Sequence, residues 1–551
     1  DDGTSSSTVS KNENYTYVWD NTLTYLKTLE DHNLVGLLGF SIEKYEYDGL
    51  SASGSNFPDD EVLTNLGSAA TKNSIASSYN SNTLVSTFAR LEYKFKNRYL
   101  ATFTFRADGS SKFGPDKRWG YFPSGALAWI ISEENFLKDY SHIVSYLKLR
   151  ASIGKTGSQN LGNYDWRTLM GSATYNGAPG IKPSSLGNDI LQWESQVQKE
   201  IGLDYGFWED RIRGSIGYYQ KKVDNLLYSD PVPYSSSFSS VTQNIGSLKN
   251  KGFEFDVKVD IIKNTQKDLT WDFDFNVARN ITTLEKLNSE AEYFGGGAYE
   301  YFKIKVGGKT GILYGYKYGG RLIRTNEELV ALKTINPETG QQQYYRDNNN
   351  YERPGDLYIM DLDGDGQITA DGDRTEIGNA NPDFFGGFGT TLYWKGLMVN
   401  ATFTYSVGAD RFYDEEKSSA GDINSYNVSK NVLKSWTMNP GVDRGYPRAM
   451  YYGWGSNSII TDRYVHDASF LRLSALNISY RLPKRLFGSS IVDAIDLTFQ
   501  ATNLFTWTKY PGMDPQGNFS TSYSAFYNMG IDYSSYPSAR TYNVGIKITL
   551  K

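Results

Sequence analysis

The chain has 551 residues, a formal net charge of −6, 39% hydrophobic residues and no cysteine. It carries no basic stripe that could neutralise phosphates, which argues against a nucleic-acid partner. It also has no run of 18 apolar residues, which excludes helical membrane spans. Its 43 Tyr, 28 Phe and 11 Trp suit the interfacial girdles of a membrane barrel, and they equally suit a glycan-binding surface.

The predicted elements are strands in which apolar and polar residues alternate with period two, so that one face is apolar. Many of them reach the roughly 9–11 residues that a transmembrane strand needs, whereas ordinary globular strands average about five or six. In chain order, the alternation predicts about fifteen strands, at 14–28, 33–45, 84–95, 99–107, 121–131, 146–154, 196–206, 211–220, 250–262, 268–280, 385–394, 397–407, 470–481, 495–505 and 538–550.

The connections between these strands alternate between short turns and long loops. Outer-membrane barrels have short periplasmic turns and long extracellular loops, whereas a soluble sandwich distributes its loop lengths more evenly. The sequence therefore predicts an all-β fold, a transmembrane antiparallel β-barrel domain over 1–551. The long extracellular loops are expected near 46–83, 155–195, 221–249, 281–384, 408–469 and 506–537.

The strand count and the first residues predict that this is the C-terminal part of a larger barrel. No signal peptide is visible at Asp1. If Lys551 ends the last strand at the periplasmic rim, about fifteen strands place residue 1 on the extracellular side. An odd count is unusual for a complete barrel.

A series of motifs resembles the SusC/RagA family of TonB-dependent outer-membrane transporters. The first is Arg106-Ala-Asp-Gly-Ser-Ser-Lys-Phe-Gly-Pro, followed by Arg118-Trp-Gly-Tyr-Phe-Pro-Ser. The resemblance covers roughly 84 to 551 and continues in order with Leu147-Lys-Leu-Arg-Ala-Ser-Ile-Gly, Trp193-Glu, Ile201-Gly-Leu-Asp, Asn244-Ile-Gly, Asn250-Lys-Gly-Phe-Glu, Phe470-Leu-Arg, Asn503-Leu-Phe-Thr-Trp-Thr-Lys-Tyr and Asp514-Pro.

The resemblance implies a 22-stranded barrel in the outer membrane of a Gram-negative bacterium, with outer-membrane lipid around it. It also implies a SusD-like surface lipoprotein as partner and an N-terminal plug, which is absent from this chain along with the remaining barrel strands. Energy would come from the TonB complex through that missing part. The family usually closes on an aromatic residue, whereas this chain ends in Leu550 and Lys551.

The sharpest chemical motif is the acidic loop that begins Asp361-Leu-Asp-Gly-Asp-Gly-Gln-Ile. Carboxylates at alternate positions, a glycine for the turn and a following isoleucine match the first half of an EF-hand calcium loop. The twelfth position is Gly372 in place of Glu, so Asp371 or Asp373 would have to replace that ligand. A structural calcium and a metal-free Asp/Gly turn both stay open. The candidate calcium ligands are Asp361, Asp363, Asp365, Gln367, Asp371 and Asp373.

The other polar motifs predict structure rather than catalysis. Arg106, Asp108, Lys112 and Arg118 are expected to brace a loop against the wall, in preference to binding an anion. Nothing in the sequence pairs Glu194 with the second carboxylate that a glycosidase requires. The histidines, which have neither metal-ligand spacing nor a Cys nucleophile for a partner, are His32, His142 and His466.

The sequence thus favours a protein that is not an enzyme and that requires no cofactor for its function. The first hypothesis is TonB-dependent import of a large nutrient, an oligosaccharide or an oligopeptide. The alternative is a non-transporting barrel that serves as a scaffold in a larger outer-membrane complex. An extracellular glycan-binding sandwich is the third. Loop aromatics that could contact either cargo or lid include Trp166, Tyr175, Tyr293, Tyr299, Tyr301, Tyr344, Tyr345, Tyr451, Tyr452 and Trp454.

Overall fold

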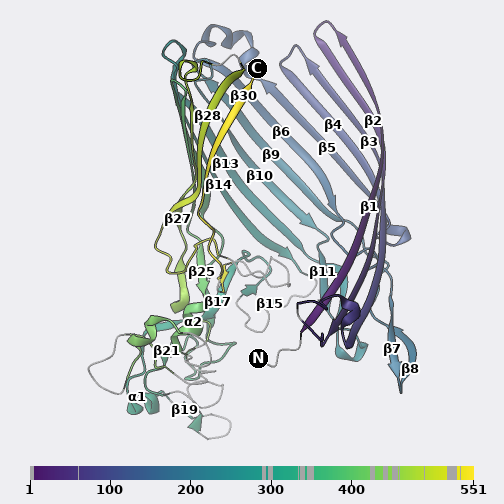
Figure 1. Ribbon diagram of the computed structural model, residues 1–551, viewed down its shortest axis with the longest axis vertical. Helices are drawn as coiled ribbons and strands as arrows, with labels where there is room; N and C mark the ends of the chain where they lie inside the picture. Colours follow the sequence, from purple (N-terminus) through teal and green to yellow (C-terminus); the bar gives the residue numbers. More distant parts are fainter. Residues whose placement is uncertain are drawn as a thin grey trace.

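A single antiparallel sheet of fifteen strands forms the body of the molecule, and the strands follow one another around it in chain order (Figure 1). This is a computed structural model, and it describes residues 5–59, 61–287, 293–295, 302–332, 334–335, 342–343, 353–421, 428–437, 445–449, 457, 459–488, 491–517, 530–533 and 535–551. The fifteen predicted strands are confirmed, because each predicted range overlaps one strand of this sheet.

The strands of the sheet are longer at several ends than their apolar alternation predicts. They are β1 (Ser6–Leu29), β2 (His32–Ser55), β3 (Thr71–Phe95), β4 (Tyr99–Ser110), β5 (Trp119–Ile130), β6 (Val144–Ser158), β9 (Glu194–Phe207), β10 (Ile212–Asp224), β13 (Ser247–Asn264), β14 (Leu269–Lys286), β23 (Phe384–Trp394), β24 (Leu397–Val407), β27 (Phe470–Arg481), β28 (Val492–Thr508) and β30 (Thr541–Leu550).

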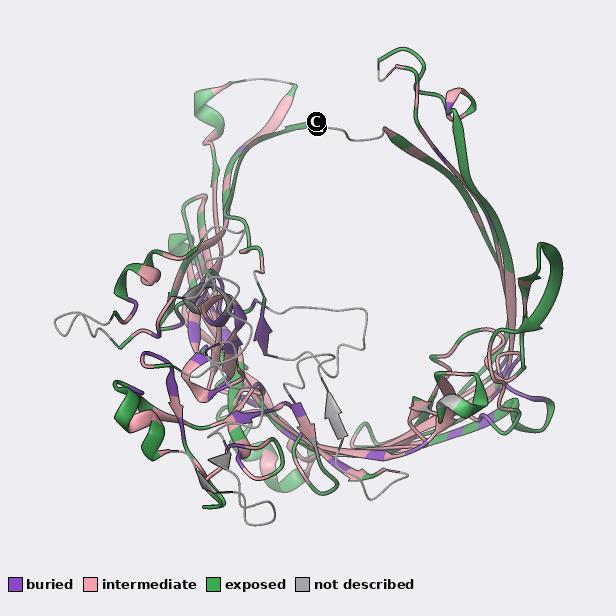
Figure 2. Cartoon of the chain, turned by 90° about the horizontal axis from the view of Figure 1, so that it is seen from below, coloured by how far each residue is buried: buried purple, intermediate pink, exposed green. Residues whose placement is uncertain are grey.

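The sheet curves into an arc, with β1 at one edge and β30 at the other (Figure 2). The short turns lie at one end of the arc and the long connections gather at the opposite end (Figure 1). Lys96 and Asn97 take positive φ angles of 51° and 54° in the turn between β3 and β4, as a type I′ hairpin turn requires. In the described part of the chain no helix has the length and apolar character needed to cross a membrane.

The prediction of a long loop at 46–83 is wrong over most of that range. β2 continues to Ser55 and β3 begins at Thr71, so the connection contains only 56–70. These added strand segments are rich in Ser, Thr, Asn and Tyr and lack a continuous apolar face. The strands were predicted from the alternation of apolar and polar residues. A strand with polar residues on both faces lacks this alternation and is therefore not detected.

The remaining long connections carry their own small elements in place of irregular loop. The hairpin strands are β7 (Met170–Tyr175), β8 (Ala178–Pro183), β11 (Leu227–Pro231) and β12 (Ser240–Asn244). The later connections contain β15 (Tyr293–Gly295), β16 (Phe302–Ile304), β17 (Ile312–Tyr316), β18 (Tyr318–Leu322), α1 (Asn326–Ala331), β19 (Thr334–Ile335), β20 (Gln342–Gln343), β21 (Leu357–Ile359), β22 (Arg374–Asn379), β25 (Asp410–Tyr413), α2 (Asp414–Gly421), β26 (Val465–Asp467) and β29 (Ile531–Asp532).

Candidate functional site

One face of the sheet is an exposed apolar band. On β30, the side chains of Tyr542, Val544, Ile546, Ile548 and Leu550 are between 56% and 83% exposed, although all five are large and apolar or aromatic. Farther along the sheet, on β14, β23 and β24, half-buried rings continue this apolar face, with ring contacts that join Phe275 to Tyr405, and Phe388 to Phe403. A continuous exposed apolar surface of this extent needs an apolar environment outside the protein.

Aromatic side chains lie at both limits of this band. At the short-turn end, rings pack in series from His32 to Phe95, Tyr99 and Trp129. Toward the loop end, Trp119 is 50% exposed on the same strand as Trp129. Ten residues of strand span about 33 Å, which a tilt of about 40° reduces to about 25 Å, the height of the apolar band of an outer-membrane barrel.

The opposite face of the sheet is polar and carries paired charges. Arg150 on β6 bonds to Glu200 and, at 3.1 Å, to Asp204, both on β9. Lys258 on β13 lies 3.7 Å from Asp272 on β14. The charges of this face are therefore matched across neighbouring strands, as expected for a wall that lines an aqueous interior.

The motif around Arg106 braces a loop against this polar face. Arg106 donates to both Asp108 oxygens at 2.7 and 2.8 Å, and to Ser86 at 2.8 Å. Lys112 Nζ donates to the carbonyl of Leu161 at 3.2 Å, and Arg118 Nε donates to that of Phe113 at 3.5 Å. These are contacts within the wall and its loops, in agreement with a bracing role.

An apolar cluster completes this brace. Phe113, Phe122, Leu191 and Trp193 pack together, with exposed fractions of 9% or less. Trp193 Nε1 donates to the carbonyl of Arg118 at 2.8 Å, and Glu194 accepts from the backbone of Leu227 at 3.3 Å. Both members of the Trp-Glu pair thus tie loops together.

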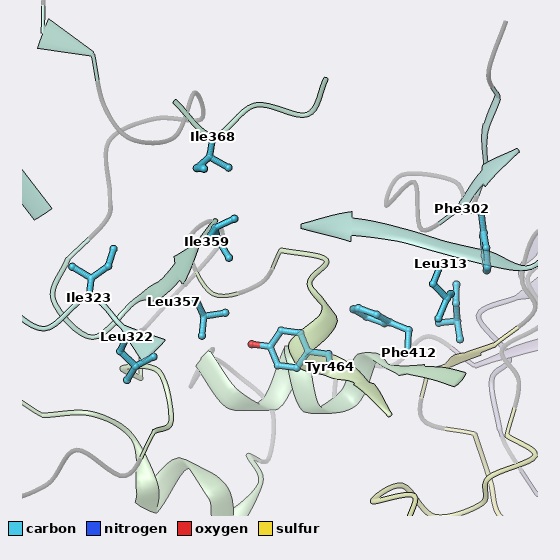
Figure 3. Packing of buried hydrophobic residues seen from close by; sticks show 10 residues of the cluster. Phe302, Leu313, Leu322, Ile323, Leu357, Ile359, Ile368, Phe412 and Tyr464 are labelled. Carbon is cyan, nitrogen blue, oxygen red and sulfur yellow. The ribbon is translucent and has the colours of Figure 1, made fainter. Parts of the chain in front are cut away.

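A second and larger core lies among the long connections, and Figure 3 shows its side chains. It draws residues from the connections between β14 and β23, between β24 and β27, and between β28 and β30. We call this packed unit the loop body. Its buried members are Phe302, Leu313, Leu322, Ile323, Leu357, Ile359, Ile368, Phe412, Tyr464 and Ile531.

Asp356 anchors the loop body electrostatically. It is fully buried, and Arg448 donates to its two oxygens at 2.7 and 3.3 Å. Asn457, also buried, donates to Asp356 at 3.0 Å and accepts from the backbone of Leu357 at 3.1 Å. The cluster joins residues about a hundred positions apart in the chain. The periodicity of the sequence therefore could not predict these contacts.

The acidic loop lies in the loop body, between β21 and β22. Three of its six candidate ligands, Asp361, Asp363 and Asp373, each offer an oxygen within 4.8 Å of the others. Asp373 is fully buried, and of the two residues predicted to replace the Glu of the twelfth position it is the one that lies in this cluster. A side chain at 372 would meet Asp363, because a Cβ there would lie 2.1 Å from its Oδ2. A larger residue at 372 would therefore require the carboxylate of Asp363 to move.

The same carboxylates also fold the loop through its backbone. Asp361 accepts from the amides of Gly364 and Gly366, each at 2.7 Å. Asp373 accepts from those of Leu362 and Thr369 at the same distance. Hydrogen bonds of this kind are those of a metal-free Asp/Gly turn, and carboxylates keep lone pairs for a cation beside them.

The other three predicted ligands lie outside this carboxylate cluster. Asp365 is exposed and accepts from the amide of Gln367 at 2.7 Å. Gln367 is half-buried, and Asp371 is exposed. The geometry thus brings together Asp361, Asp363 and Asp373 and leaves the side chains of Asp365 and Asp371 exposed.

The histidines take packing and hydrogen-bonding roles where contacts are described. His32 Nδ1 lies 2.6 Å from the hydroxyl of Tyr93, within the aromatic row at the short turns. His466 Nε2 lies 2.7 Å from Glu416, which also accepts from Tyr446 at 2.9 Å. Burial, followed by the charge of Glu416, raises the pKa of Tyr446 to about 12, so this phenol remains a donor at neutral pH.

Most of the loop aromatics proposed to contact cargo or lid lie outside the described residues. Trp166 packs against the bracing cluster, and Tyr175 is 87% exposed on β7. The side chain of Tyr293 is not described. The residues Tyr299, Tyr301, Tyr344, Tyr345, Tyr451, Tyr452 and Trp454 lie outside the described residues.

One face of the sheet is apolar and exposed, with aromatic side chains at both of its limits, and the other face is polar. The long loops lie at one end. Together these features are typical of the wall of an outer-membrane β-barrel. The chain matches the family described as "TonB dependent receptor-like, beta-barrel" over residues 1–504. It belongs to this family, whose members are outer-membrane transporters and not enzymes.

Individual relatives place the chain with SusC and RagA. It is 34% identical to "TonB-dependent receptor P3" of Formosa agariphila, over 96% of this chain and 52% of that protein. It is 32% identical to "TonB-dependent receptor SusC" of Bacteroides thetaiotaomicron, over 85% of this chain and 44% of that protein. The RagAB peptide transporter structure matches with a TM-score of 0.80 and 26% identity, over 98% of this chain and 56% of that chain. The chain spans about half the length of these relatives.

Proposed function

We propose that this chain forms the larger part of the barrel wall of a TonB-dependent importer in the outer membrane of a Gram-negative bacterium. The observation that carries the proposal is the pairing of an exposed apolar band, with aromatic side chains at its limits, and a charge-matched polar face behind it. The band fits lipid, and the polar face fits an aqueous path for a large nutrient. The cargo class is an oligosaccharide or an oligopeptide.

The partners that such an importer requires lie outside this chain. Because β1 and β30 stand at the two edges of the sheet, closure into a 22-stranded barrel needs further strands. A plug, the TonB contact and a SusD-like lipoprotein complete the proposal. The likeness to SusC and to the RagAB structure supports it. The loop body, at the end of the long connections, is a surface on which such a lid could rest.

Mass spectrometry of the detergent-solubilised complex, combined with uptake assays, tests this function. We expect a plug-bearing N-terminal part, a co-purifying lipoprotein, and nutrient uptake that stops when TonB is deleted. Stable partners of another kind, with no plug and no TonB-dependent uptake, would favour the scaffold. The matched control is the same strain carrying a plug-deleted gene, which should retain the barrel and lose TonB-dependent uptake.

We also propose that Asp361, Asp363 and Asp373 hold a structural calcium ion that closes the acidic loop. Oxygen-only ligands suit this hard cation, and the loop places Ile368 in the core of the loop body. The ion would therefore stabilise the loop body and take no part in transport chemistry.

Elemental analysis of the purified full-length protein tests the calcium site. Asp363→Ala is expected to remove about one calcium per chain, since it deletes one of three clustered carboxylates. Asp371→Ala, an exposed carboxylate in the same loop, is the control and should leave the calcium content unchanged. Equal calcium in the wild type and the Asp363 variant would leave the metal-free turn as the correct interpretation.

A further inference from the structure

Four cations lie on the outer, apolar face of the wall, near its loop end. Each is two residues closer to the loops than an apolar residue of the band, so both point to the same side of the strand. We call these four cations the cation belt. They are Lys155 beyond Ile153 on β6, Lys199 beyond Ile201 on β9, Lys251 beyond Phe253 on β13, and Arg279 beyond Val277 on β14.

The two central cations of the belt lie in one row across the sheet. Lys199 is opposite Gln220 on β10, and Gln220 is opposite Lys251. Two strand spacings of about 4.8 Å separate the two lysines by about 10 Å. The amide of Gln220 adds an N–H donor between them. An anionic group seated over Gln220 would therefore lie within reach of both long side chains.

The outer two cations continue this line at the same height in the wall. Lys155 is one strand and one row farther toward the loops, and Arg279 is one strand and one row farther toward the short turns. In Figure 1 the strands from β14 to β6 follow from left to right and run obliquely toward the loops on the right. With a tilt of about 40°, four strand spacings climb about 12 Å and two rows descend about 10 Å. The belt is therefore nearly parallel to the rim.

The belt lies at the depth where a lipid head group is expected. Tyr218 and Phe253, which are 46% and 44% exposed, lie in the row next to it on the side of the short turns. Exposed aromatic side chains of this kind mark the boundary between hydrocarbon and head groups. Because the long loops of an outer-membrane barrel are extracellular, this boundary belongs to the outer leaflet.

The belt lacks counter-charges within the described part of the chain. None of its four side chains forms an ion pair with a described residue. The next cations toward the loops differ, since Lys222 pairs with Asp224 at 3.1 Å and Lys249 pairs with Glu285 at 3.3 Å. Four unpaired cations in a chain of net charge −6 indicate that the anions for this row come from outside the protein.

We propose that the cation belt binds the phosphate groups of lipopolysaccharide in the outer leaflet. Lysine and arginine form strong, charge-assisted hydrogen bonds with phosphate, and the apolar rows beside the belt accept acyl chains. The belt spans about 19 Å across the sheet, which suits a broad, phosphorylated glycolipid head group better than a single phosphodiester. The proposal rests on the placement of the wall in the outer membrane, which is part of the proposed function.

Lipid binding to the purified full-length protein in neutral detergent tests this assignment. The probes are deep-rough lipopolysaccharide, the same lipid after dephosphorylation, and phosphatidylglycerol, each titrated and followed by native mass spectrometry. We expect lipopolysaccharide to bind at least tenfold more tightly than either of the other lipids. The double variant Lys199→Gln/Lys251→Gln should raise its Kd about tenfold or more, since it removes two cations that contact phosphate.

The matched control is Lys221→Gln/Lys547→Gln, which removes two lysines from the polar face of the wall and should change the Kd by less than about twofold. Heat-modifiable gel mobility checks that both double variants form the barrel. The assignment is overturned if lipopolysaccharide does not bind, if the dephosphorylated lipid or phosphatidylglycerol binds equally well, or if the two double variants weaken binding to the same extent.

Uptake by cells separates this assignment from the import function itself. TonB-dependent nutrient uptake, by a protein that does not bind lipopolysaccharide, would overturn the assignment and leave import standing. Lipopolysaccharide binding that Lys199→Gln/Lys251→Gln weakens, with no TonB-dependent uptake in any strain, would overturn import and leave the cation belt as a lipid site.

Discussion

Replacing Asp356 with alanine is expected to destabilise the loop body locally by about 3–5 kcal/mol, because it leaves the partners of a buried charge unpaired. Arg448 and Asn457 both donate to this fully buried carboxylate. The measurement is hydrogen exchange of the β21 amides in the full-length protein. Exchange there should accelerate about a hundredfold or more.

Lys317→Ala provides the control for this measurement. Lys317 pairs with Asp462 at 3.4 Å in the same loop body, but the two side chains are 47% and 24% exposed. A surface pair of this kind contributes less than about 1 kcal/mol. Similar exchange rates in the two variants would mean that the Asp356 cluster does not hold the loop body together.

The second large effect is expected for Phe255→Arg on the apolar face of β13. Phe255 lies at mid-strand and its ring is 6.4 Å from that of Phe275 on β14. If this face contacts lipid, an arginine near the bilayer midplane should cost about 2–4 kcal/mol of barrel stability. Folding of the full-length protein from urea into lipid vesicles measures the change.

Glu254→Arg is the matched control, since it introduces the same side chain one residue away on the polar face. Glu254 is exposed and pairs in register with Ala278. We expect a change within about 1 kcal/mol, because an aqueous face tolerates either charge. If neither variant changed the stability, the apolar face would not contact lipid, and the prediction of a membrane-spanning wall would be wrong.

The sequence was informative about the wall because a barrel wall obeys a local rule. Phe253, Phe255 and Val257 alternate with Glu254 and Asp256, and the strand formed as predicted. The same rule missed the first third of β1, the end of β2 and the first half of β3, because these segments are rich in Ser, Thr and Asn and present no continuous apolar face. Strands that are stabilised by pairing and side-chain hydrogen bonds leave no hydrophobic period to detect.

The acidic loop and the Asp356 cluster also differ in whether local sequence could predict them. Asp361 and Asp363 are two residues apart and Asp373 is close behind, so a motif could suggest their meeting before any fold was known. Asp356 and Arg448 meet only because two long connections fold together. Contacts of that kind depend on packing between distant segments, and one sequence without relatives carries no trace of them.

The loop body also determines which parts of this protein can be exchanged between relatives. Its core takes Leu313 and Ile359 from one connection, Phe412 and Tyr464 from a second and Ile531 from a third. A chimera that replaces a single connection would bring in side chains shaped for other neighbours, with the cavities and overlaps that such mismatches create. Recombination that preserves folding must therefore transfer all three connections together, as one inherited unit, while the strands beneath them stay in place.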